Sequence, residues 1–426
     1  MDKDKLRTKE NLGESKVAVF NELDRLQEVV VWGEPSCEAL LGQLLPLKES
    51  LFFSRYNVAE ARIEHARMQA MIETHGVKVL RFKDIYADML MQSSLPAGAP
   101  QDVAELSARI KERGWELYRL YETDIHEEEK FGREIVNPEE VLSNVQNLID
   151  SDVAKYGVGK AIRLNYELSL AQEKPIANII FARDQSNALG DKIVMSNMRW
   201  GIRKPEVAIY RSIYEYLGFG ENLVDVTEGT FEGGDAMIVD GICYIGVGAR
   251  TSMEAVEEVA RKIGEGLNDN GISIVAVVNE KHAKESAMYK SPTDEHMSVM
   301  HLDTFWGPLA TGLSLGLSSE IDKRKIFVLK NNSRGVEKTE VCNFGDFLRL
   351  RNETELLAIL PEEQESYASN FLNMGNGTII SPLEKNIRVK EMIEKNGVVK
   401  VESPNISQLV GGYGAVHCMT ASIKRG

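Results

Sequence analysis

Short runs of β-branched and aliphatic residues alternate along this chain with stretches in which apolar residues recur every three or four positions. The runs at residues 26–33 and 77–80 predict buried strands, and the spacing of apolar residues over about 59–73 predicts a helix between them. Residues 1–18 are polar and predict a tail. The folded part of the chain therefore opens with a strand, a helix and a strand.

The pattern changes between about residues 85 and 174. Glu, Lys, Arg, Leu and Ala dominate there, and apolar side chains keep helical spacing, as at Val103, Leu106 and Ile110. Pro138 is typical of the first turn of a helix. We expect a helical insert here, which interrupts one folded domain spanning residues 19–426.

The rhythm of strands and helices resumes after the insert. Helices are predicted from Pro205, over 252–267 and up to Lys395. Strands are predicted at residues 177–181, 193–195, 223–226, 236–239, 242–245, 272–278, 325–329, 371–372, 377–380 and 398–401. A hairpin, a helix and a return strand recur several times, which indicates a radially repeated architecture.

Composition and charge narrow the classes of function. The chain has 426 residues, 43% of them hydrophobic, as in a globular protein with a sizeable core. Its 65 acidic and 50 basic side chains give a net charge of −15, which disfavours nucleic acid binding and would suit a small cationic substrate. Such a charge more often serves solubility. No apolar stretch approaches the ~20 residues that cross a bilayer, and the charged residues 1–14 are not expected to be a secretory signal.

The four cysteines lie far apart in the sequence. Cys37, Cys243, Cys342 and Cys418 form no CxxC pair and have no metal-ligand spacing. We therefore expect free thiols, a cytoplasmic location and no metal site.

Four polar clusters fall between the regular elements. They are Phe-Ala-Arg-Asp at 181–184, Glu-Gly-Gly-Asp at 232–235, His-Leu-Asp at 301–303 and a glycine-rich run at 411–420 that contains Cys418. Catalytic groups gather on loops and strand ends that a rigid scaffold holds. A thiol, an imidazole and several carboxylates together suit nucleophilic chemistry at a positively charged carbon.

Each cluster taken alone has a plainer interpretation. A lone cysteine near a chain end is usually inert, and the two glycines before Asp235 could simply form a turn in which Asp235 binds backbone. His301 and Asp303 could be a capped turn or half of a metal site. His417 is expected to be structural, because neighbours on an extended segment point to opposite faces. Arg183 is expected to support its neighbours.

Taken in order, the four clusters resemble those of arginine deiminase and its relatives in the guanidino-group-modifying superfamily. The resemblance runs from the strand at residue 26 to Cys418. It implies an α/β fold, a five-bladed pseudosymmetric propeller of ββαβ repeats with a helical insertion. It also implies a homo-oligomer, a dimer or larger, that needs no cofactor.

The resemblance implies a role for each residue of a five-membered centre. Cys418 would be the nucleophile and His301 the general acid and base. Asp184 and Asp303 would grip the guanidinium group, and Glu232 would lie near the reacting carbon.

The resemblance also implies how the rest of the substrate binds. Phe181 would form an apolar wall beside the guanidinium, while Arg203 and Arg250 would bind the substrate's α-carboxylate. Tyr413 is assigned to the same part of the site, because it stands five residues before the cysteine, where the family usually has an arginine that touches this carboxylate. Residues 415–416 are Ala and Val, which take a positive φ less readily than glycine.

The expected activity is hydrolysis of a guanidino C–N bond. Most simply, L-arginine and water give L-citrulline and ammonia through a covalent intermediate on Cys418. One alternative is an amidinotransferase, although the Glu-Gly-Gly-Asp cluster resembles the hydrolases more. Others are a hydrolase of another guanidino compound, which Tyr413 favours, and a non-catalytic sensor of a guanidino ligand on the same scaffold.

Overall fold

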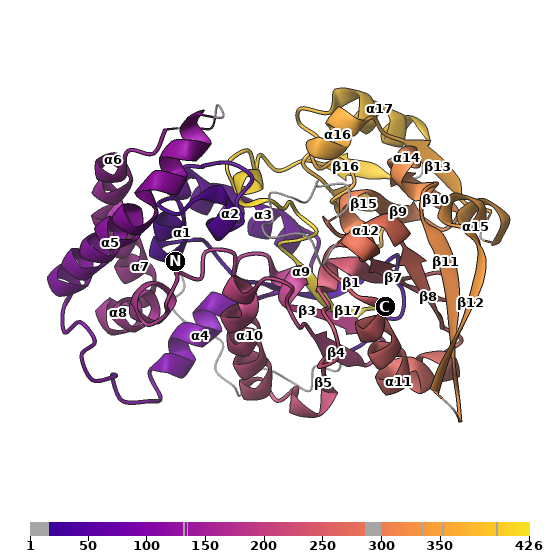
Figure 1. The fold of residues 1–426 in the computed structure, drawn as a ribbon, viewed down its shortest axis with the longest axis horizontal. Helices are drawn as coiled ribbons and strands as arrows, with labels where there is room; N and C mark the ends of the chain where they lie inside the picture. The colour runs from indigo at the N-terminus through magenta and orange to yellow at the C-terminus, as the bar shows by residue number, and fades with distance from the viewer. Residues whose placement is uncertain are drawn as a thin grey trace.

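A computed structural model describes residues 17–130, 133, 135–285, 300–333, 335–351, 353–397 and 399–426. The predicted tail therefore lies outside the described residues, except for residues 17 and 18. The described chain has a mixed α/β fold, with its named strands in five separate sheets, four of three strands and one of five. Figure 1 shows helices before residue 171 on one side of the molecule and the sheets across the rest.

The three-stranded sheets share one topology. In the first after the insert, β3 (Ser186–Leu189) pairs antiparallel with β4 (Lys192–Met195), and β5 (Leu223–Asp225) returns parallel to β4 after helix α10 (Lys204–Tyr216). Two later sheets repeat this order with β9 (Trp306–Ala310), β10 (Leu313–Gly316) and β13 (Glu355–Ala358), and with β14 (Leu372–Asn373), β15 (Thr378–Ile380), α17 (Ile387–Lys395) and β16 (Lys400–Glu402). The predicted recurrence of hairpin, helix and return strand is confirmed.

The five-stranded sheet begins in the same way and is then extended. Its repeat consists of β6 (Ala236–Val239), β7 (Ile242–Val247), α11 (Met253–Asp269) and β8 (Ser273–Val278), and a long hairpin of β11 (Lys325–Asn332) and β12 (Gly335–Asn343) adds to β8. Shorter helices connect the sheets: α12 (Glu280–Glu285), α14 (Ser318–Ile321), α15 (Phe344–Arg351) and α16 (Pro361–Glu365).

The first sheet joins the two ends of the folded chain. Strand β1 (Leu26–Val31) pairs parallel with β2 (Lys78–Arg81), which follows α1 (Cys37–Gly42), α2 (Leu47–Ser50) and α3 (Val58–Thr74), and it pairs antiparallel with β17 (Ala421–Arg425). The Arg425 guanidinium Nη2 lies 2.8 Å from Glu22 Oε1, and both side chains are buried. The segment just before β17, which contains the predicted nucleophile, is therefore anchored to the first sheet.

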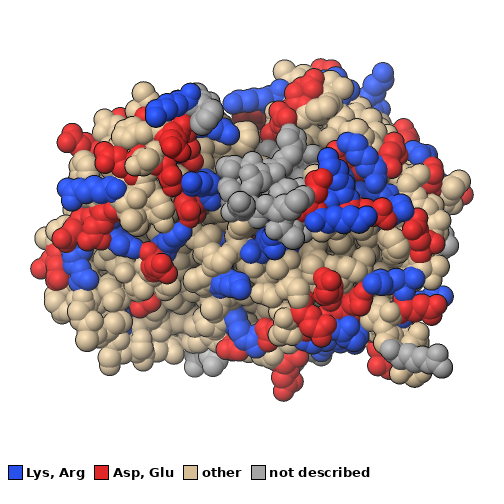
Figure 2. Space-filling model, viewed as in Figure 1, with Lys and Arg blue, Asp and Glu red and all other residues tan. Residues whose placement is uncertain are grey.

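The region of the predicted insert is helical. It contains α4 (Phe82–Leu90), α5 (Val103–Lys130), α6 (Pro138–Ser143), α7 (Val145–Tyr156), α8 (Val158–Asn165) and a π-helical turn (Tyr166–Leu170). Acidic and basic side chains lie next to one another over much of the face in Figure 2. None of the described helices combines the length and the apolar character that a bilayer crossing requires.

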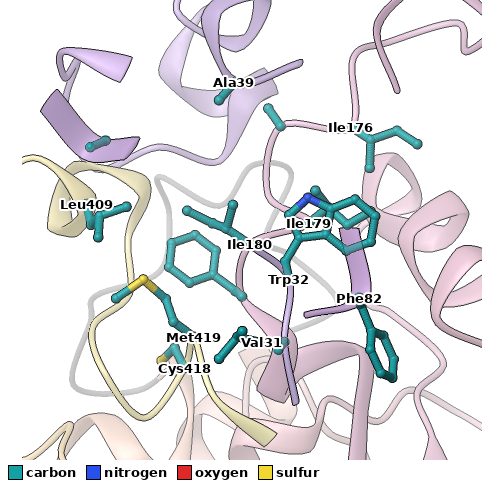
Figure 3. Close-up of a cluster of buried hydrophobic side chains, with 14 of the residues drawn as sticks. Val31, Trp32, Ala39, Phe82, Ile176, Ile179, Ile180, Leu409, Cys418 and Met419 are labelled. Carbon is teal, nitrogen blue, oxygen red and sulfur yellow. The ribbon is translucent and has the colours of Figure 1, made fainter. Parts of the chain in front are cut away.

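One predicted strand does not form. The run 177–181 forms turns before a short helix, α9 (Ala182–Gln185), with the Phe181 N–H bonded to the Asn178 carbonyl at 3.1 Å. Pro175 and Asn178 favour turns, and Ile179 and Ile180 pack into the core in Figure 3 instead of pairing with a strand. Val398, in the last predicted strand, lies outside the described residues.

Six strands of the structure have no counterpart among the predicted strands: β3, β9, β10, β12, β13 and β17. Of these, β9 contains Gly307 and Pro308, residues that are uncommon inside strands. The structure accommodates Pro308 because β9 is an edge strand, where a missing N–H removes no necessary ladder bond.

A buried network of ion pairs connects α7 to the part of the chain that contains Ser36, Arg62 and Lys83. The Asp152 carboxylate, only 1% exposed, lies 3.0 Å from Arg62, 2.6 Å from the Ser36 hydroxyl and 3.9 Å from Lys83. Burial alone would raise the pKa of Asp152, but the Lys83 and Arg62 charges outweigh it and hold the pKa below its usual range. The helical region is thus tied to the sheets by charge as well as by apolar packing.

Replacing Asp152 by asparagine tests this network. Asp152→Asn keeps the shape but removes the anion between Arg62 and Lys83, which leaves Glu38, 4.0 Å from Lys83, as the remaining buried carboxylate beside that lysine. We therefore expect the free energy of unfolding to fall by about 3 kcal/mol. Asp150→Asn, on the exposed face of the same helix, should change it by less than about 0.5 kcal/mol. Urea unfolding followed by circular dichroism measures both, and equal small effects would show that the network does not stabilise the fold.

Candidate functional site

The four polar clusters meet at one buried centre. Asp184 lies on α9, Glu232 precedes the turn that leads into β6, and His301 and Asp303 lie at the turn before β9. Cys418 lies in the turn before β17. All five residues are at most 5% exposed. The structure therefore brings together the five residues that the sequence singled out.

His301 lies between two carboxylates. Its Nε2 is 2.9 Å from Glu232 Oε2, and its Nδ1 is 3.6 Å from Asp184 Oδ1. Burial alone would lower the pKa of His301, but the Asp184 charge and the hydrogen bond with Glu232 outweigh it and raise the pKa to about 9. The imidazole is therefore a cation at neutral pH.

Glu232 is held as an anion. Burial would raise its pKa, but the Arg250 charge and the hydrogen bond with His301 hold the pKa well below its usual range. Arg250 Nη1 lies 2.9 Å from Glu232 Oε2, and the Arg199 backbone N–H donates to Oε1 at 3.1 Å.

The Cys418 thiol lies at the edge of a hydrophobic cluster, next to Met419 (Figure 3). Its Sγ is 3.7 Å from Asp303 Oδ2 and 3.1 Å from the side-chain nitrogen of Asn370. Burial and the negative charges of Asp303 and Asp184 raise the thiol pKa well above its ordinary value. The thiol is therefore protonated near neutral pH unless a positive charge enters the site.

His417 contacts the same carboxylate as Cys418. Its Nδ1 lies 2.7 Å from Asp303 Oδ2, and its Nε2 lies 3.5 Å from Glu22. Residues 416–419 form a turn and not an extended segment, so the expectation that His417 points away from Cys418 is wrong. Through these two contacts His417 connects Asp303 to Glu22.

Three polar atoms of the centre are buried and lack a hydrogen-bond partner among the described residues. They are Asp184 Oδ1, His301 Nδ1 and Asp303 Oδ1. Buried polar atoms without partners are uncommon, and such atoms at a site mark the place of a ligand's complementary groups. Gly234 keeps this space open, because a Cβ there would lie 2.7 Å from His301 Nδ1 and 3.2 Å from Asp184 Oδ1.

Phe181 packs against the glycine-rich segment beside Cys418. A Cβ on Gly412 would lie 2.9 Å from the Phe181 ring, and one on Gly414 would lie 2.5 Å from the ring and 3.0 Å from the Cys418 Cβ. These glycines are required for close approach and not for a positive φ. Residues 415–416 also have no positive φ, so Ala and Val cause no strain there.

Tyr413 does have a positive φ, of 79°. Its ring stacks on Phe53 with the centroids 5.5 Å apart, and Phe53 is 43% exposed. The aromatic pair therefore lies at the rim of the molecule, above the buried centre.

The two predicted carboxylate-binding arginines are buried and each contacts a carboxylate of the centre. Arg203 lies 2.6 Å from Asp184 and 2.9 Å from Glu206, and it also donates to the Asn178 carbonyl at 3.3 Å. Arg250 contacts Glu232. Arg203 thus orients Asp184, which the sequence assigned to the guanidinium, and Arg250 orients Glu232, which it assigned a place near the reacting carbon.

Two further residues support the centre as expected. Arg183 donates to the Thr420 carbonyl at 2.9 Å and, through its backbone N–H, to the Cys418 carbonyl. Asp235 accepts from the Leu302 backbone N–H at 3.0 Å, next to His301.

Asp184, Glu232 and His301 lie close enough to hold a metal ion, although the closest contacts of the two carboxylates are with opposite nitrogens of the imidazole.

Sequence reasoning missed Asn370, which contacts the Cys418 sulfur. An uncharged side chain 48 residues before the cysteine carries no motif. Its position directly before β14, at the end of the loop after α16, was the one available signal.

Comparisons with known proteins agree on one family. A profile of the arginine deiminase family matches residues 48–425. An arginine deiminase from Mycobacterium avium (strain 104) is 23% identical over 425 residues, covering 93% of this chain and 95% of that protein. One from Rhodococcus erythropolis is 23% identical over 430 residues, covering 97% and 98%.

Solved structures share the fold. An amidinotransferase of the saxitoxin pathway from Microseira wollei has a TM-score of 0.54 at 15% identity, covering 96% of this chain and 97% of that chain. A dimethylarginine dimethylaminohydrolase in an adduct with S-methyl-L-thiocitrulline has a TM-score of 0.51 at 16% identity, covering 93% and 99%. With the family profile over most of its length, this chain belongs to the arginine deiminase family and is an enzyme that acts on C–N bonds of amidines.

Proposed function

We propose that this protein hydrolyses L-arginine to L-citrulline and ammonia through a covalent intermediate on Cys418. The observation that carries the proposal is the set of unpartnered buried atoms on Asp184, His301 and Asp303 beside the thiol. Carboxylates accept paired N–H bonds from a planar guanidinium, which also supplies the positive charge that this centre lacks.

In the proposed first half-reaction the Cys418 thiolate attacks the guanidinium carbon, and the C=N electron pair moves onto nitrogen. His301 then gives its proton to the leaving nitrogen, the C–N bond breaks, and ammonia departs. An amidino-thioether on Cys418 remains. His301 is suited to this step because its pKa of about 9 keeps it protonated at neutral pH.

In the second half-reaction His301, now neutral, takes a proton from water as the water oxygen adds to the same carbon. Collapse of this adduct breaks the C–S bond and returns the thiolate, and the hydroxyl proton of the adduct passes to solvent as the neutral ureido product is released. With that proton taken up by the departed ammonia, protonated arginine and water give citrulline and ammonium.

Ionisation of Cys418 is proposed to depend on the substrate. Asp303 and Asp184 raise the thiol pKa in the empty site, and the single positive charge of a guanidinium between them would offset part of their negative charge. Phe181 would form the apolar wall of the pocket.

The substrate tail is proposed to bind above this centre. Arg203 and Arg250 would bind the α-carboxylate by giving up part of their contacts with Asp184 and Glu232. Tyr413 would lie beside the α-carboxylate.

We also propose that the five sheets form the blades of one pseudosymmetric propeller, because an antiparallel strand pair and a parallel return strand repeat in each. Residues 85–174 would be an insert into a single domain over 19–426. The four free cysteines support a reducing location, the cytoplasm, and the family resemblance supports a dimer or larger homo-oligomer.

Removal of the thiol tests the reaction. We expect L-arginine to give equal amounts of citrulline and ammonia, and Cys418→Ser to lower the rate by at least about 10³-fold. Cys342→Ser, on the long hairpin away from the centre, should keep the rate. Acid quenching and mass spectrometry should find a Cys418 adduct equal in mass to arginine less ammonia.

Other outcomes would point elsewhere. Ornithine-dependent turnover without citrulline would favour an amidinotransferase, and turnover of a different guanidine alone would exclude arginine as the substrate. Tight binding of arginine without an adduct would support a sensor.

The charge on His301 gives a second test. Its folded pKa, about 9, lies above the ordinary value of 6.5, so the stabilisation from its charged form is complete below pH 6.5 and is lost as pH rises through 9. Histidine ¹⁵N NMR should show one imidazole with a midpoint near 9, absent in His301→Gln. Glu232→Gln removes a neighbouring anion and should lower this midpoint by about one unit. A midpoint near 6.5 in the unmodified protein would contradict the proposed acid.

A further inference from the structure

Asn370 bridges two of the polar clusters. Its side-chain oxygen accepts from the backbone N–H groups of His417 and Cys418, at 3.1 Å and 3.2 Å. Its side-chain nitrogen lies 3.1 Å from the Cys418 sulfur and 3.3 Å from the Asp303 carbonyl. The side chain is fully buried. Every hydrogen-bonding group of this amide is therefore used.

These contacts fix the orientation of the amide. Two backbone N–H donors face one end of the Asn370 side chain, and an NH₂ group there would meet both of them with its own hydrogens. The oxygen must occupy that end. The NH₂ group consequently points at the Cys418 sulfur and cannot turn away without losing two hydrogen bonds.

The surroundings of the sulfur give this donor a chemical role. Asp303 Oδ2, 3.7 Å away, accepts a hydrogen bond from a protonated thiol but repels a thiolate. The pKa of the Cys418 thiol is raised by burial, Asp303 and Asp184, and is lowered by the Ala415 backbone N–H and the Asn370 side chain. Asp303 therefore favours the protonated sulfur, whereas the Ala415 N–H and the Asn370 side chain favour the ionised sulfur.

We propose that Asn370 is a further catalytic residue, whose side-chain N–H stabilises the Cys418 thiolate. The inference rests on the proposed role of Cys418 as the nucleophile. Asn370 donates to the sulfur when the thiol loses its proton, and it donates again when the thiolate is expelled at the end of the reaction. Hydrogen bonds to an ionised acceptor are stronger than those to a neutral one, so the contact favours the reactive form.

The loop that carries Asn370 is itself fixed to the centre. The side chains of Gln364 and Ser369 both donate to the Thr304 carbonyl at 2.8 Å. Thr304 belongs to the same turn as His301 and Asp303. These contacts fix the position of Asn370 relative to His301 and Asp303.

Two variants separate the donor from the structural role. Asn370→Asp keeps the oxygen that accepts from the backbone of residues 417 and 418 but loses the N–H donor and adds a negative charge. Asn370→Ser removes the amide N–H donor without adding charge, and it also removes the oxygen that accepts from the backbone. Asn373→Asp is the matched control, because Asn373 is equally buried three residues along the chain and donates to the Pro308 and Leu309 carbonyls instead.

The measurement is the pH dependence of Cys418 alkylation by iodoacetamide, read on the Cys418 peptide by mass spectrometry. We expect Asn370→Asp to raise the midpoint by about one unit or more and Asn370→Ser by about half a unit. With arginine as substrate, kcat should fall about 100-fold and about 10-fold, with KM changed less than about threefold. Asn373→Asp should leave the midpoint unchanged.

An unchanged midpoint in the folded Asn370 variants would overturn the proposal, and so would an equal rise in Asn373→Asp. If Asn370→Asp does not fold, Asn370→Ser decides the outcome. Because alkylation needs no substrate, the role of Asn370 is settled even if arginine is not hydrolysed.

Discussion

Charged side chains buried at the centre of this fold have to compensate one another, because water does not reach them. Asp184 faces Arg203, Glu232 faces Arg250 and His301, and Asp303 faces His417. The compensation stops short at the oxygens of Asp184 and Asp303 that lack partners among the described residues. A planar cation in that space would complete the pairing. Electrostatic balance of the fold and recognition of the substrate are therefore the same physical problem.

The same balance governs the reactivity of Cys418. In the empty site the nearby carboxylates favour the neutral thiol, which is a weak nucleophile and is slow to oxidise. In the proposed mechanism a bound guanidinium would reverse this preference, so the nucleophile would form only next to its target. A neutral donor such as Asn370 fits this arrangement better than a permanent cation would, because a cation at 3.1 Å would ionise the thiol whether or not substrate is present.

The sequence predicts the parts of the fold in which local pattern and tertiary role agree. The apolar run before Gly33 is buried, and so are the apolar residues that recur with helical spacing in α11, as expected. The four polar clusters meet because the repeated fold brings their loops together. It fails where packing overrides the pattern. The apolar run ending at Phe181 reads as a strand but fills the core, and Pro308 is tolerated only because its strand is at an edge. Asn370 belongs to no sequence motif, because its role depends on a contact across 48 residues.

In the proposed mechanism the chemistry and the choice of substrate depend on different parts of the chain. The charged groups of the centre are buried and paired with one another, so we expect their replacement to abolish the reaction. Tyr413 has a left-handed conformation that costs a residue with a side chain about 1–2 kcal/mol, and stacking on the exposed Phe53 ring offsets part of that cost. Because this aromatic pair is not part of the buried charge pairs, it can be altered without disturbing them. We therefore propose that the aromatic pair contributes to the choice among guanidines.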